Sequence, residues 1–219
     1  MGKASVDGAG AFVVVDRLGS GLEGLTSILP RRRRRHLAEA MLMDVFQALR
    51  ESRLVQTIVL GTRQPEAAAV GRRADVPVVD AMEADDDPAD GDAPRLSASL
   101  WGDLPLLEGQ DLAFLIGRAA RQDRLVLVPT PGGEGLSLAV TRERGFMKDL
   151  GTGTLASWRR ESTDRGLATE VYATPAGMRP STAEDLLQVY MAARLSRAKR
   201  LLKEWRMGPT LKHETGAEG

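Results

Sequence analysis

The chain has 219 residues, and its 42% hydrophobic content can supply the core of one large α/β domain or of two small ones. Basic and acidic residues number 30 each, so the net charge of zero gives no global electrostatic reason to expect nucleic acid or an anionic membrane as a partner. With no cysteine and no apolar stretch near the roughly 18 residues of a spanning helix, the chain excludes disulfides, cysteine-type zinc sites and thiol nucleophiles, and we expect a cytoplasmic protein without a membrane segment.

Short apolar runs alternate with helical patterns in the N-terminal half. Residues 11–15 (AFVVV) are apolar and mostly β-branched, as in a strand buried on both faces of a parallel sheet. From Leu37 onward, apolar residues recur with the period of a helix that buries one face. The elements expected in this half are strands at 11–15, 57–60 and 76–79 and helices at 31–51 and 65–74.

The alternation continues after an acidic segment. Residues 83–95 (EADDDPADGDAPR) combine six acids with Pro and Gly and cannot bury apolar surface, so a mobile loop is expected there. The elements expected after it are a strand from Leu96 that ends at 102–105, a helix at 109–120, strands at 125–129 and 136–140, a helix at 154–166, a strand at 170–173 and one long closing helix at 181–206.

This order of elements predicts one α/β domain with three layers. Strands and helices that alternate along a chain give a doubly wound, mainly parallel sheet with helices on both faces. We expect the domain over residues 11–180, a flexible N-terminus at 1–10, an added C-terminal amphipathic helix at 181–206 and a flexible tail at 207–219.

The closing helix has two different faces. Ser181 and Glu184 have the spacing of a capping box at its start. One predicted face is apolar and the other basic, so the helix either packs on the domain with a solvated outer face or offers a surface to a second copy or a partner. The apolar face holds Leu187, Tyr190, Ala198, Leu201, Leu202 and Trp205, and the basic face holds Arg194, Arg197, Lys199, Arg200, Lys203 and Arg206.

Several familiar motifs are absent or out of context. Residues 19–24 match G-x-G-x-x-G after the first strand, but Pro30 follows within about two turns and no acid ends the second strand, so dinucleotide binding is disfavoured. No G-x-S-x-G elbow and no G-x-x-x-x-G-K-[ST] loop occurs. His36 and His213 have neither Cys nor paired carboxylates nearby, so neither resembles a zinc ligand.

Five consecutive arginines, residues 31–35, open the helix that follows. Five cations at a helix N-terminus oppose the helix dipole, so the run does not serve helix stability. It is either a solvated face or a group that attracts an anion such as a substrate phosphate.

Asp103 stands out because it follows a predicted parallel strand directly. In doubly wound sheets the carboxyl ends of the strands form the crevice that binds ligands, and a carboxylate there can hold Mg²⁺ against the phosphates of a nucleotide. The alternative is an acid that caps the turn before Pro105. The glycine turn at 131–133 also has two interpretations: it either connects two strands or lets a phosphate approach the backbone.

Four stretches in this order resemble the 2-phospho-L-lactate guanylyltransferases of the CofC type and their phosphoenolpyruvate-using relatives: 33–49 (RRRHLAEAMLMDVFQAL), 102–107 (GDLPLL), 129–140 (PTPGGEGLSLAV) and 150–158 (LGTGTLASW). The resemblance covers most of residues 11–180. It implies a GT-A-like nucleotidyltransferase fold. It also implies transfer of GMP from GTP to a small phosphoacid (2-phospholactate, phosphoenolpyruvate or 3-phosphoglycerate), with release of pyrophosphate, in the biosynthesis of coenzyme F-420.

The resemblance also assigns roles to residues. It makes Asp103 a catalytic residue as the ligand of Mg²⁺, and it places the phosphate of the phosphoacid at Gly151 and Thr154, at a helix N-terminus that suits an anion. Residues 133–137 align with the G-T-G-T-N stretch of the family. That alignment makes Gly133, Gly135 and Ser137 nucleotide-binding residues and Leu136 a substrate-binding residue.

The chain departs from the family where charge matters. In a gap-free comparison Asp16, Leu22 and Gly24 stand where the family has Lys, Lys and Arg on the triphosphate, and Arg17 and residues 31–35 are the cations left nearby. Losing one such electrostatic group typically costs about 10² to 10³ in rate. Three functions therefore remain open: a guanylyltransferase, a catalytically inactive homologue that acts as a partner or regulator, and a module that binds anions or nucleic acid through its basic segments.

Overall fold

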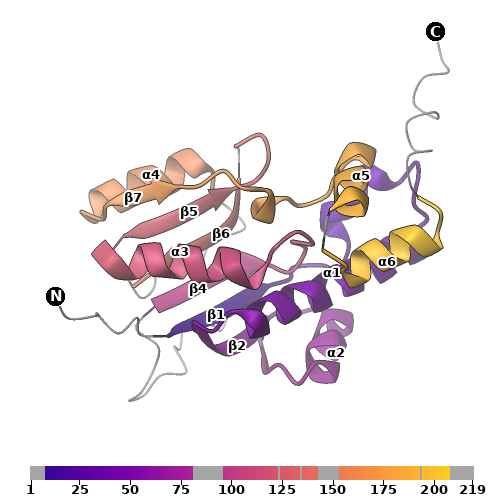
Figure 1. The fold of residues 1–219 in the computed structure, drawn as a ribbon, viewed down its shortest axis with the longest axis horizontal. Coiled ribbons are helices and arrows are strands. Elements are labelled where there is room, and N and C mark those ends of the chain that lie inside the picture. The colour runs from indigo at the N-terminus through magenta and orange to yellow at the C-terminus, as the bar shows by residue number, and fades with distance from the viewer. Residues whose placement is uncertain are drawn as a thin grey trace, which may run out of the picture.

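The computed structural model describes residues 8–80, 96–122, 124–133, 135–142, 153–192 and 194–207. Figure 1 shows these residues as one sheet with helices around it. The strands are β1 (Ala9–Val14), β2 (Val55–Gly61), β3 (Val78–Val79), β4 (Leu96–Trp101), β5 (Leu125–Pro129), β6 (Leu136–Thr141) and β7 (Thr169–Val171). The α-helices are α1 (Arg31–Glu51), α2 (Pro65–Arg73), α3 (Gly109–Gln122), α4 (Leu155–Asp164), α5 (Ala183–Met191) and α6 (Arg197–Glu204), and two 3-10 turns are η1 (Ser20–Leu25) and η2 (Pro175–Gly177).

The sheet is mainly parallel, as predicted. Its strand order is β3-β2-β1-β4-β6-β5-β7, and in the described part of the chain only β6 runs against its neighbours. The chain moves outward from β1 to β3 and then returns to β4 on the other side of β1. The point where the winding reverses therefore lies between β1 and β4, where sheets of this kind bind their ligands.

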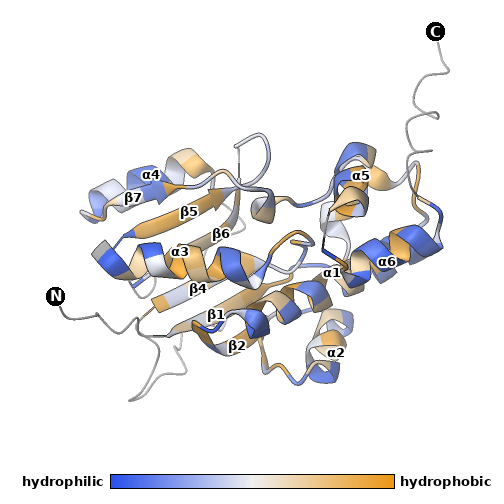
Figure 2. Ribbon diagram, viewed as in Figure 1, coloured by the Kyte–Doolittle hydropathy of each residue, from blue (hydrophilic) through white to orange (hydrophobic). Residues whose placement is uncertain are grey.

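Side chains alternate between two apolar layers. On β5, Val126 and Val128 join the main core with residues of α1, α2 and α3, whereas Leu125 and Leu127 pack with Trp158 of α4. The hydropathy colouring in Figure 2 shows β5 as apolar along its length, as expected for a strand covered on both faces. Helices on both faces of the sheet confirm the predicted three-layer α/β fold.

The element pattern of the domain is confirmed, with small shifts at the ends. The helix predicted at 31–51 has those bounds, and β5 has those predicted for it. β1 begins at Ala9, so residues 9–10 belong to the sheet rather than to a flexible N-terminus. Residues 1–7, the whole acidic segment at 83–95, and the tail from 208 with His213 lie outside the described residues.

The single closing helix predicted at 181–206 is wrong, because the structure has two helices there, α5 and α6. Figure 1 shows both at one end of the molecule, beside α1. The chain leaves helical geometry at Ala192, and Ser196 then caps a new helix by accepting from Lys199 N at 3.1 Å. Apolar periodicity hid the break, because Ser and its neighbours do not disturb a 3.6-residue pattern.

The capping box of α5 is also shifted from the prediction. Thr182, not Ser181, is the N-cap, and its hydroxyl oxygen accepts from Asp185 N at 3.2 Å. The carboxylate of Asp185 in turn accepts from Thr182 N at 2.9 Å and from Ser181 N at 2.8 Å. These bonds fix the chain immediately after Pro180, where it leaves the sheet for the C-terminal helices.

Candidate active site

A cavity lies at the carboxyl ends of β1 and β4, where the winding of the sheet reverses. Its volume is about 20 Å³, room for about one water molecule. The cavity is therefore too small to enclose a ligand as large as a nucleotide. The cavity is lined by Val14, Val15, Asp16, Arg17, Leu18, Gly19, Ser20, Ala38, Trp101, Gly102, Asp103 and Arg179.

Asp103 lies in this cavity, as the sequence predicts, but its carboxylate is already paired. Nε of Arg179 donates to Oδ1 at 2.7 Å and Nη2 donates to Oδ2 at 2.9 Å, so the two side chains form a bidentate pair. The side chains are only 18% (Asp103) and 23% (Arg179) exposed. Bidentate arginine–carboxylate pairs are among the strongest charge-assisted contacts, and partial burial strengthens this one.

Trp101 holds the guanidinium of Arg179 from a second side. The carbon of the guanidinium lies 4.2 Å from the centre of the Trp101 ring, in cation–π geometry. The indole is fixed in turn, because its Nε1 donates to the carbonyl oxygen of Leu136 at 3.0 Å. The end of β4 and the residues directly after it therefore supply both the aromatic surface and the carboxylate that position one arginine from the C-terminal part of the chain.

The η1 segment closes over this pair at close range. A Cβ at Gly21 would overlap Oδ2 of Asp103, and a Cβ at Gly24 would overlap the carbonyl oxygen of Ser181. Leu22 is buried in the apolar cluster that joins α1 to the C-terminal helices. Two of the positions where the family has basic residues thus hold packing contacts here, and a long cationic side chain does not fit at either without rearrangement.

The described residues do not fit a resident divalent cation at Asp103. Both carboxylate oxygens accept from one guanidinium, and no group of three or more His, Cys, Asp or Glu side chains arranged to hold a metal occurs within the described ranges. A protein site for Mg²⁺ usually offers one or two free carboxylate oxygens. The pairing with Arg179 engages both oxygens of Asp103, so a metal at this position would have to share them with the guanidinium or displace it.

The glycine turn between β5 and β6 is an ordinary hairpin connection in its described residues. Gly132 and Gly133 have positive φ values of 93° and 78°, which glycine adopts without strain. Gly133 N donates to Thr130 O at 2.9 Å, and Gly135 N donates to the Thr130 hydroxyl at 3.2 Å. These amides bind their own turn, so a phosphate would have to compete for them. Glu134 lies outside the described residues.

The two residues after this turn are buried. The side chain of Leu136 packs in the cluster with Trp158, and the hydroxyl of Ser137 donates to the carbonyl oxygen of Gly177. Ser137 therefore ties β6 to η2, the turn that leads into Arg179. The roles predicted for Leu136 and Ser137 in ligand binding stay predictions, and their side chains reach a ligand only if this packing opens.

Thr154 caps α4. Its hydroxyl oxygen accepts from Ser157 N at 3.1 Å, which leaves the hydroxyl proton and the first amides of the helix available to an anion. The side chain of Thr154 is exposed. The phosphate site predicted at Gly151 and Thr154 stays a prediction, since Gly151 lies outside the described residues.

The remaining cations near the cavity are largely engaged. Arg17 pairs with Glu23, but both side chains are 62% exposed, so this contact is weak and exchangeable. In the arginine run, Arg34 donates to Leu29 O at 2.9 Å, Arg35 pairs with Glu39 and Glu66, and Arg33 lies over the ring of Trp205. The run at 31–35 therefore contributes to local packing as well as to positive charge.

Arg179 is the site residue that sequence reasoning missed. It lies in the loop between η2 and α5, outside any periodic element, and it is 76 residues from Asp103. No pattern in one sequence links two such positions. The available signal was compositional: Met178-Arg179-Pro180 places an arginine at the predicted end of the domain, in a connection where functional side chains often occur.

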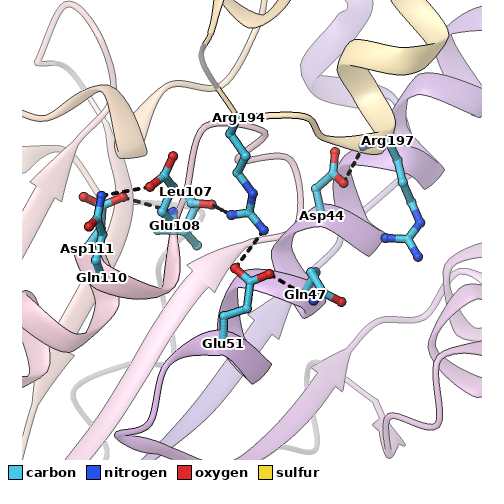
Figure 3. A network of polar contacts seen from close by, with 9 residues as sticks. All are labelled: Asp44, Gln47, Glu51, Leu107, Glu108, Gln110, Asp111, Arg194 and Arg197. Atoms are coloured by element: carbon cyan, nitrogen blue, oxygen red, sulfur yellow. Dashed lines mark hydrogen bonds and ion pairs between the residues drawn. The ribbon is translucent and has the colours of Figure 1, made fainter.

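Polar contacts also join α1 to the C-terminal segment, as drawn in Figure 3. The carboxylate of Asp44, 5% exposed, accepts from Arg197 N at 2.8 Å and from Ala198 N at 2.9 Å, so a residue of α1 caps α6. Arg194 reaches from the connection between α5 and α6 to Leu107 O at 2.9 Å and to Glu51 at 3.0 Å. We call this set of contacts the α1 seam.

Burial raises the pKa of Asp44 above its usual 3.8, because the charged form loses solvation. The amides of Ala198 and Arg197 oppose this shift in part by donating to the carboxylate. Burial likewise raises the pKa of Asp111, whose carboxylate accepts from Glu108 N at 3.0 Å at the start of α3. Neither acid lines the cavity at Asp103, so their shifts concern the scaffold and not the site.

In the described part of the chain, no helix is both long and apolar enough to cross a lipid bilayer. The predicted homodimer through the C-terminal helices stays a prediction. Met191 and Leu195, each 66% exposed, are the large apolar side chains open to solvent in that region.

Comparisons with known proteins agree with this architecture. The family described as guanylyl transferase, CofC like, matches residues 11–218. A phosphoenolpyruvate guanylyltransferase of Conexibacter woesei is 34% identical over 165 residues, which is 70% of this chain and 74% of that protein.

Solved structures show the same fold at low identity. A protein of Desulfovibrio desulfuricans G20 described as a nucleotide-diphospho-sugar transferase is 14% identical, with a TM-score of 0.66 over 91% of this chain and 98% of that one. The 4-diphosphocytidyl-2C-methyl-D-erythritol synthase of Anaerococcus prevotii is 12% identical, with a TM-score of 0.53 over 90% and 97%. The Rv0371c protein of Mycobacterium tuberculosis, solved with manganese, is 15% identical, with a TM-score of 0.53 over 86% and 100%.

Proposed function

The chain belongs to the family of CofC-like guanylyl transferases, and we propose that it transfers GMP from GTP to a small phosphoacid, with release of pyrophosphate. The observation that carries the proposal is the position of Asp103, which follows β4 in the cavity where the winding of the sheet reverses. Phosphoenolpyruvate is the first candidate acceptor, because the similar Conexibacter protein is named for it. 2-Phospholactate and 3-phosphoglycerate are the alternatives, and the product would serve the biosynthesis of coenzyme F-420 in the cytoplasm.

The cleft offers a cation and donors for such ligands. Arg179 and Arg17 line the cavity and provide the positive charge that a triphosphate needs. Gly133, Gly135 and Ser137 are the proposed nucleotide contacts, and Leu136, Gly151 and Thr154 are proposed to face the phosphoacid. Because the described residues do not fit the Mg²⁺ expected at Asp103, no step of the reaction is assigned to a metal bound there.

A second candidate function is a catalytically inactive homologue that acts as a partner or regulatory protein. Specific packing favours it: Leu22 is buried, Gly24 lies against the Ser181 carbonyl, and Asp16 adds a negative charge to the cavity. Two positions that carry cations on the triphosphate elsewhere in the family are thus part of the fold here. A protein that only binds could keep this arrangement and the C-terminal surface, through which we also expect a homodimer.

Pyrophosphate release distinguishes the two functions. The purified protein would be incubated with each of the four nucleoside triphosphates and with phosphoenolpyruvate, 2-phospholactate or 3-phosphoglycerate, in parallel in MgCl₂ and in EDTA. For an enzyme we expect pyrophosphate only with GTP and one phosphoacid. Asp103→Asn should then lower the rate about 10²-fold or more, since the pair that positions Arg179 is weakened.

The matched control is Asp164→Asn, which removes an exposed carboxylate of α4 remote from the cavity lining. It should leave pyrophosphate release unchanged. If no combination gives pyrophosphate while GTP still binds, the protein is the inactive homologue. If GTP does not bind at all, the transferase is contradicted, and the role of a partner or regulatory protein is the candidate that stays.

A further inference from the structure

We propose that the guanidinium of Arg179 is the permanent cation of this cleft and takes the place of a divalent metal at Asp103, so that a phosphorylated ligand binds here without metal. The inference rests on the proposed function, because it concerns the same cleft. It differs from the magnesium site expected from the resemblance, since both oxygens of Asp103 are already paired with Arg179.

The charges in the cavity favour the guanidinium over a metal ion. A metal bound to the same two oxygens would bring a second cation within a few ångströms of Arg179, in a partly buried cavity where repulsion is poorly screened. Asp16, which also lines the cavity, is its other acid among the described residues. Glu23 is nearby but pairs with Arg17. A metal bound here would therefore have to share these two carboxylates with the arginine that it displaces.

Arg179 is also held in place by contacts that do not involve Asp103. Its guanidinium stacks on Trp101, and that indole is anchored to the Leu136 carbonyl. On the chain side, Gly177 accepts from the buried hydroxyl of Ser137, and the capping box of Thr182 begins three residues after Arg179. Releasing the arginine to admit a metal would therefore disturb a stacked ring and leave a half-buried guanidinium without its carboxylate partner.

The guanidinium keeps a donor for a ligand. Nε and Nη2 donate to Asp103, and among the described residues Nη1 donates to no acceptor. A phosphate oxygen can bind Nη1 while the pair with Asp103 stays intact, since arginine offers five N–H donors in a fixed plane. Arg17 can exchange Glu23 for the same ligand, because that pair is exposed. The ligand class is a phosphate monoester or a nucleoside triphosphate.

The first test measures Mn²⁺ binding by electron paramagnetic resonance, in which the signal of the free ion disappears on binding. The full-length wild type, Arg179→Met and the double variant Arg179→Met with Asp103→Asn would be compared. We expect the wild type and the double variant to bind equal amounts of Mn²⁺, and Arg179→Met alone to bind about one additional ion, because its carboxylate is free. Ions held by the acidic stretch at 83–95 cancel in these differences.

The result that would overturn the inference is a wild-type protein that binds one more Mn²⁺ ion than the double variant. That outcome would show that a metal displaces Arg179 from Asp103. Thermal denaturation of each variant confirms that all of them are folded during the measurement.

The second test measures GTP binding by calorimetry in two buffers, one with MgCl₂ and one with EDTA. The ionic strength of the two buffers is made equal, so that salt screens the charges of the protein to the same degree in both. We expect the affinity in EDTA to lie within about threefold of that in MgCl₂, and Arg179→Met to lose about tenfold or more in both, the usual worth of a hydrogen bond to a charged group. Arg194→Met is the matched control, because Arg194 is buried to a similar degree, with 20% of its side chain exposed, and also pairs with a carboxylate. It should bind GTP like the wild type.

The outcomes separate the inference from the function on which it rests. GTP binding that requires Mg²⁺, or that Arg179→Met leaves unchanged, contradicts the inference but not the proposed transferase. Absence of GTP binding in both buffers contradicts the proposed transferase, and the Mn²⁺ comparison then decides alone whether Arg179 excludes a metal from Asp103.

Discussion

The cleft at Asp103 and the α1 seam at Asp44 both connect the domain to its C-terminal segment, but they do so through different contacts. In each, an aspartate from the sheet-and-helix part of the chain meets a segment from the C-terminal part. Asp44 accepts from two backbone amides at the start of α6, whereas Asp103 accepts from one side chain, Arg179. Backbone amides in a helix cannot turn away, but a guanidinium on a flexible stem can adjust. The seam is therefore suited to fixed structure and the cleft to exchange with a ligand.

Burial follows the same division. Asp44 is 5% exposed and adjoins the apolar cluster that contains Met41 and Leu202. Asp103 borders a cavity, and its side chain keeps 18% exposure. The C-terminal helices are therefore held on α1 by contacts separate from those of the cleft, so the cleft can change its contacts without releasing them.

The largest effect should come from removing the carboxylate of the seam. Asp44→Ala leaves the amides of Arg197 and Ala198 buried without an acceptor, and we expect a loss of roughly 2–4 kcal/mol in the free energy of unfolding. Urea unfolding followed by circular dichroism measures the loss. Asp164→Ala, at an exposed position of α4, is the control. A loss below about 1 kcal/mol would mean that the seam is not a fixed structure.

Breaking the pair in the cleft should cost less. We expect Asp103→Asn and Arg179→Met each to lose about 1–3 kcal/mol, because each leaves a partly buried charge without its partner. The double variant should lose less than the sum of the single losses by about 1 kcal/mol or more, as for residues in direct contact. A double-mutant cycle in urea tests this coupling. Strictly additive losses would contradict the pair described here.

The ion pair of Arg194 should matter least among the arginines compared. Its partner Glu51 is 46% exposed, so the pair is screened by solvent, and the bond to the Leu107 carbonyl is the larger part of its contribution. We expect Glu51→Gln to cost less than about 0.5 kcal/mol and to become indistinguishable from the wild type at high salt. Thermal denaturation in low and high salt measures this loss of stability. A loss that persists at high salt would mean that Glu51 and Arg194 form a buried charge pair.

The smallest expected effect is a dependence of the free energy of unfolding on pH. Burial raises the pKa of Asp44, so the folded protein binds its proton more tightly than the unfolded chain does. The contribution of Asp44 to stability therefore falls as pH rises from its usual 3.8 through the raised pKa. The difference in unfolding free energy between the wild type and Asp44→Asn should shrink over this window. Urea titrations at a series of pH values measure it, and a difference that grows with pH would reverse the sign of the shift.

Local patterns predicted most of the fold because local physics decides it. The bounds of α1 follow from Pro30 before it and from the apolar period that starts at Leu37. The strands next to the cleft follow from short apolar runs. The break between α5 and α6 could not be predicted in this way, because Ser196 caps a helix without interrupting the apolar period.

The candidate site was predictable only in part. Asp103 could be placed because the end of a parallel strand is a defined position in the fold. Its partner Arg179 could not, because the contact joins residues far apart and depends on how η2 packs against β6. The burial of Leu22 could be predicted from the sequence. Leu22, Leu25 and Leu29 repeat at helix-like intervals, which indicates a buried face, and all three are buried in one cluster.

The stacking of Arg179 on Trp101 gives the cleft an optical reporter. The chain has three tryptophans. Trp158 of α4 packs against β5 and β6, and Trp205 lies beside Arg33, so neither of these two lines the cavity. Replacing those two by Phe would leave Trp101 as the single indole emitter, with a guanidinium 4.2 Å from its ring centre. Because indole emission responds to a charge near the ring, any ligand that draws Arg179 toward itself changes the spectrum. Movement of the arginine can thus be timed by stopped-flow fluorescence without an added dye.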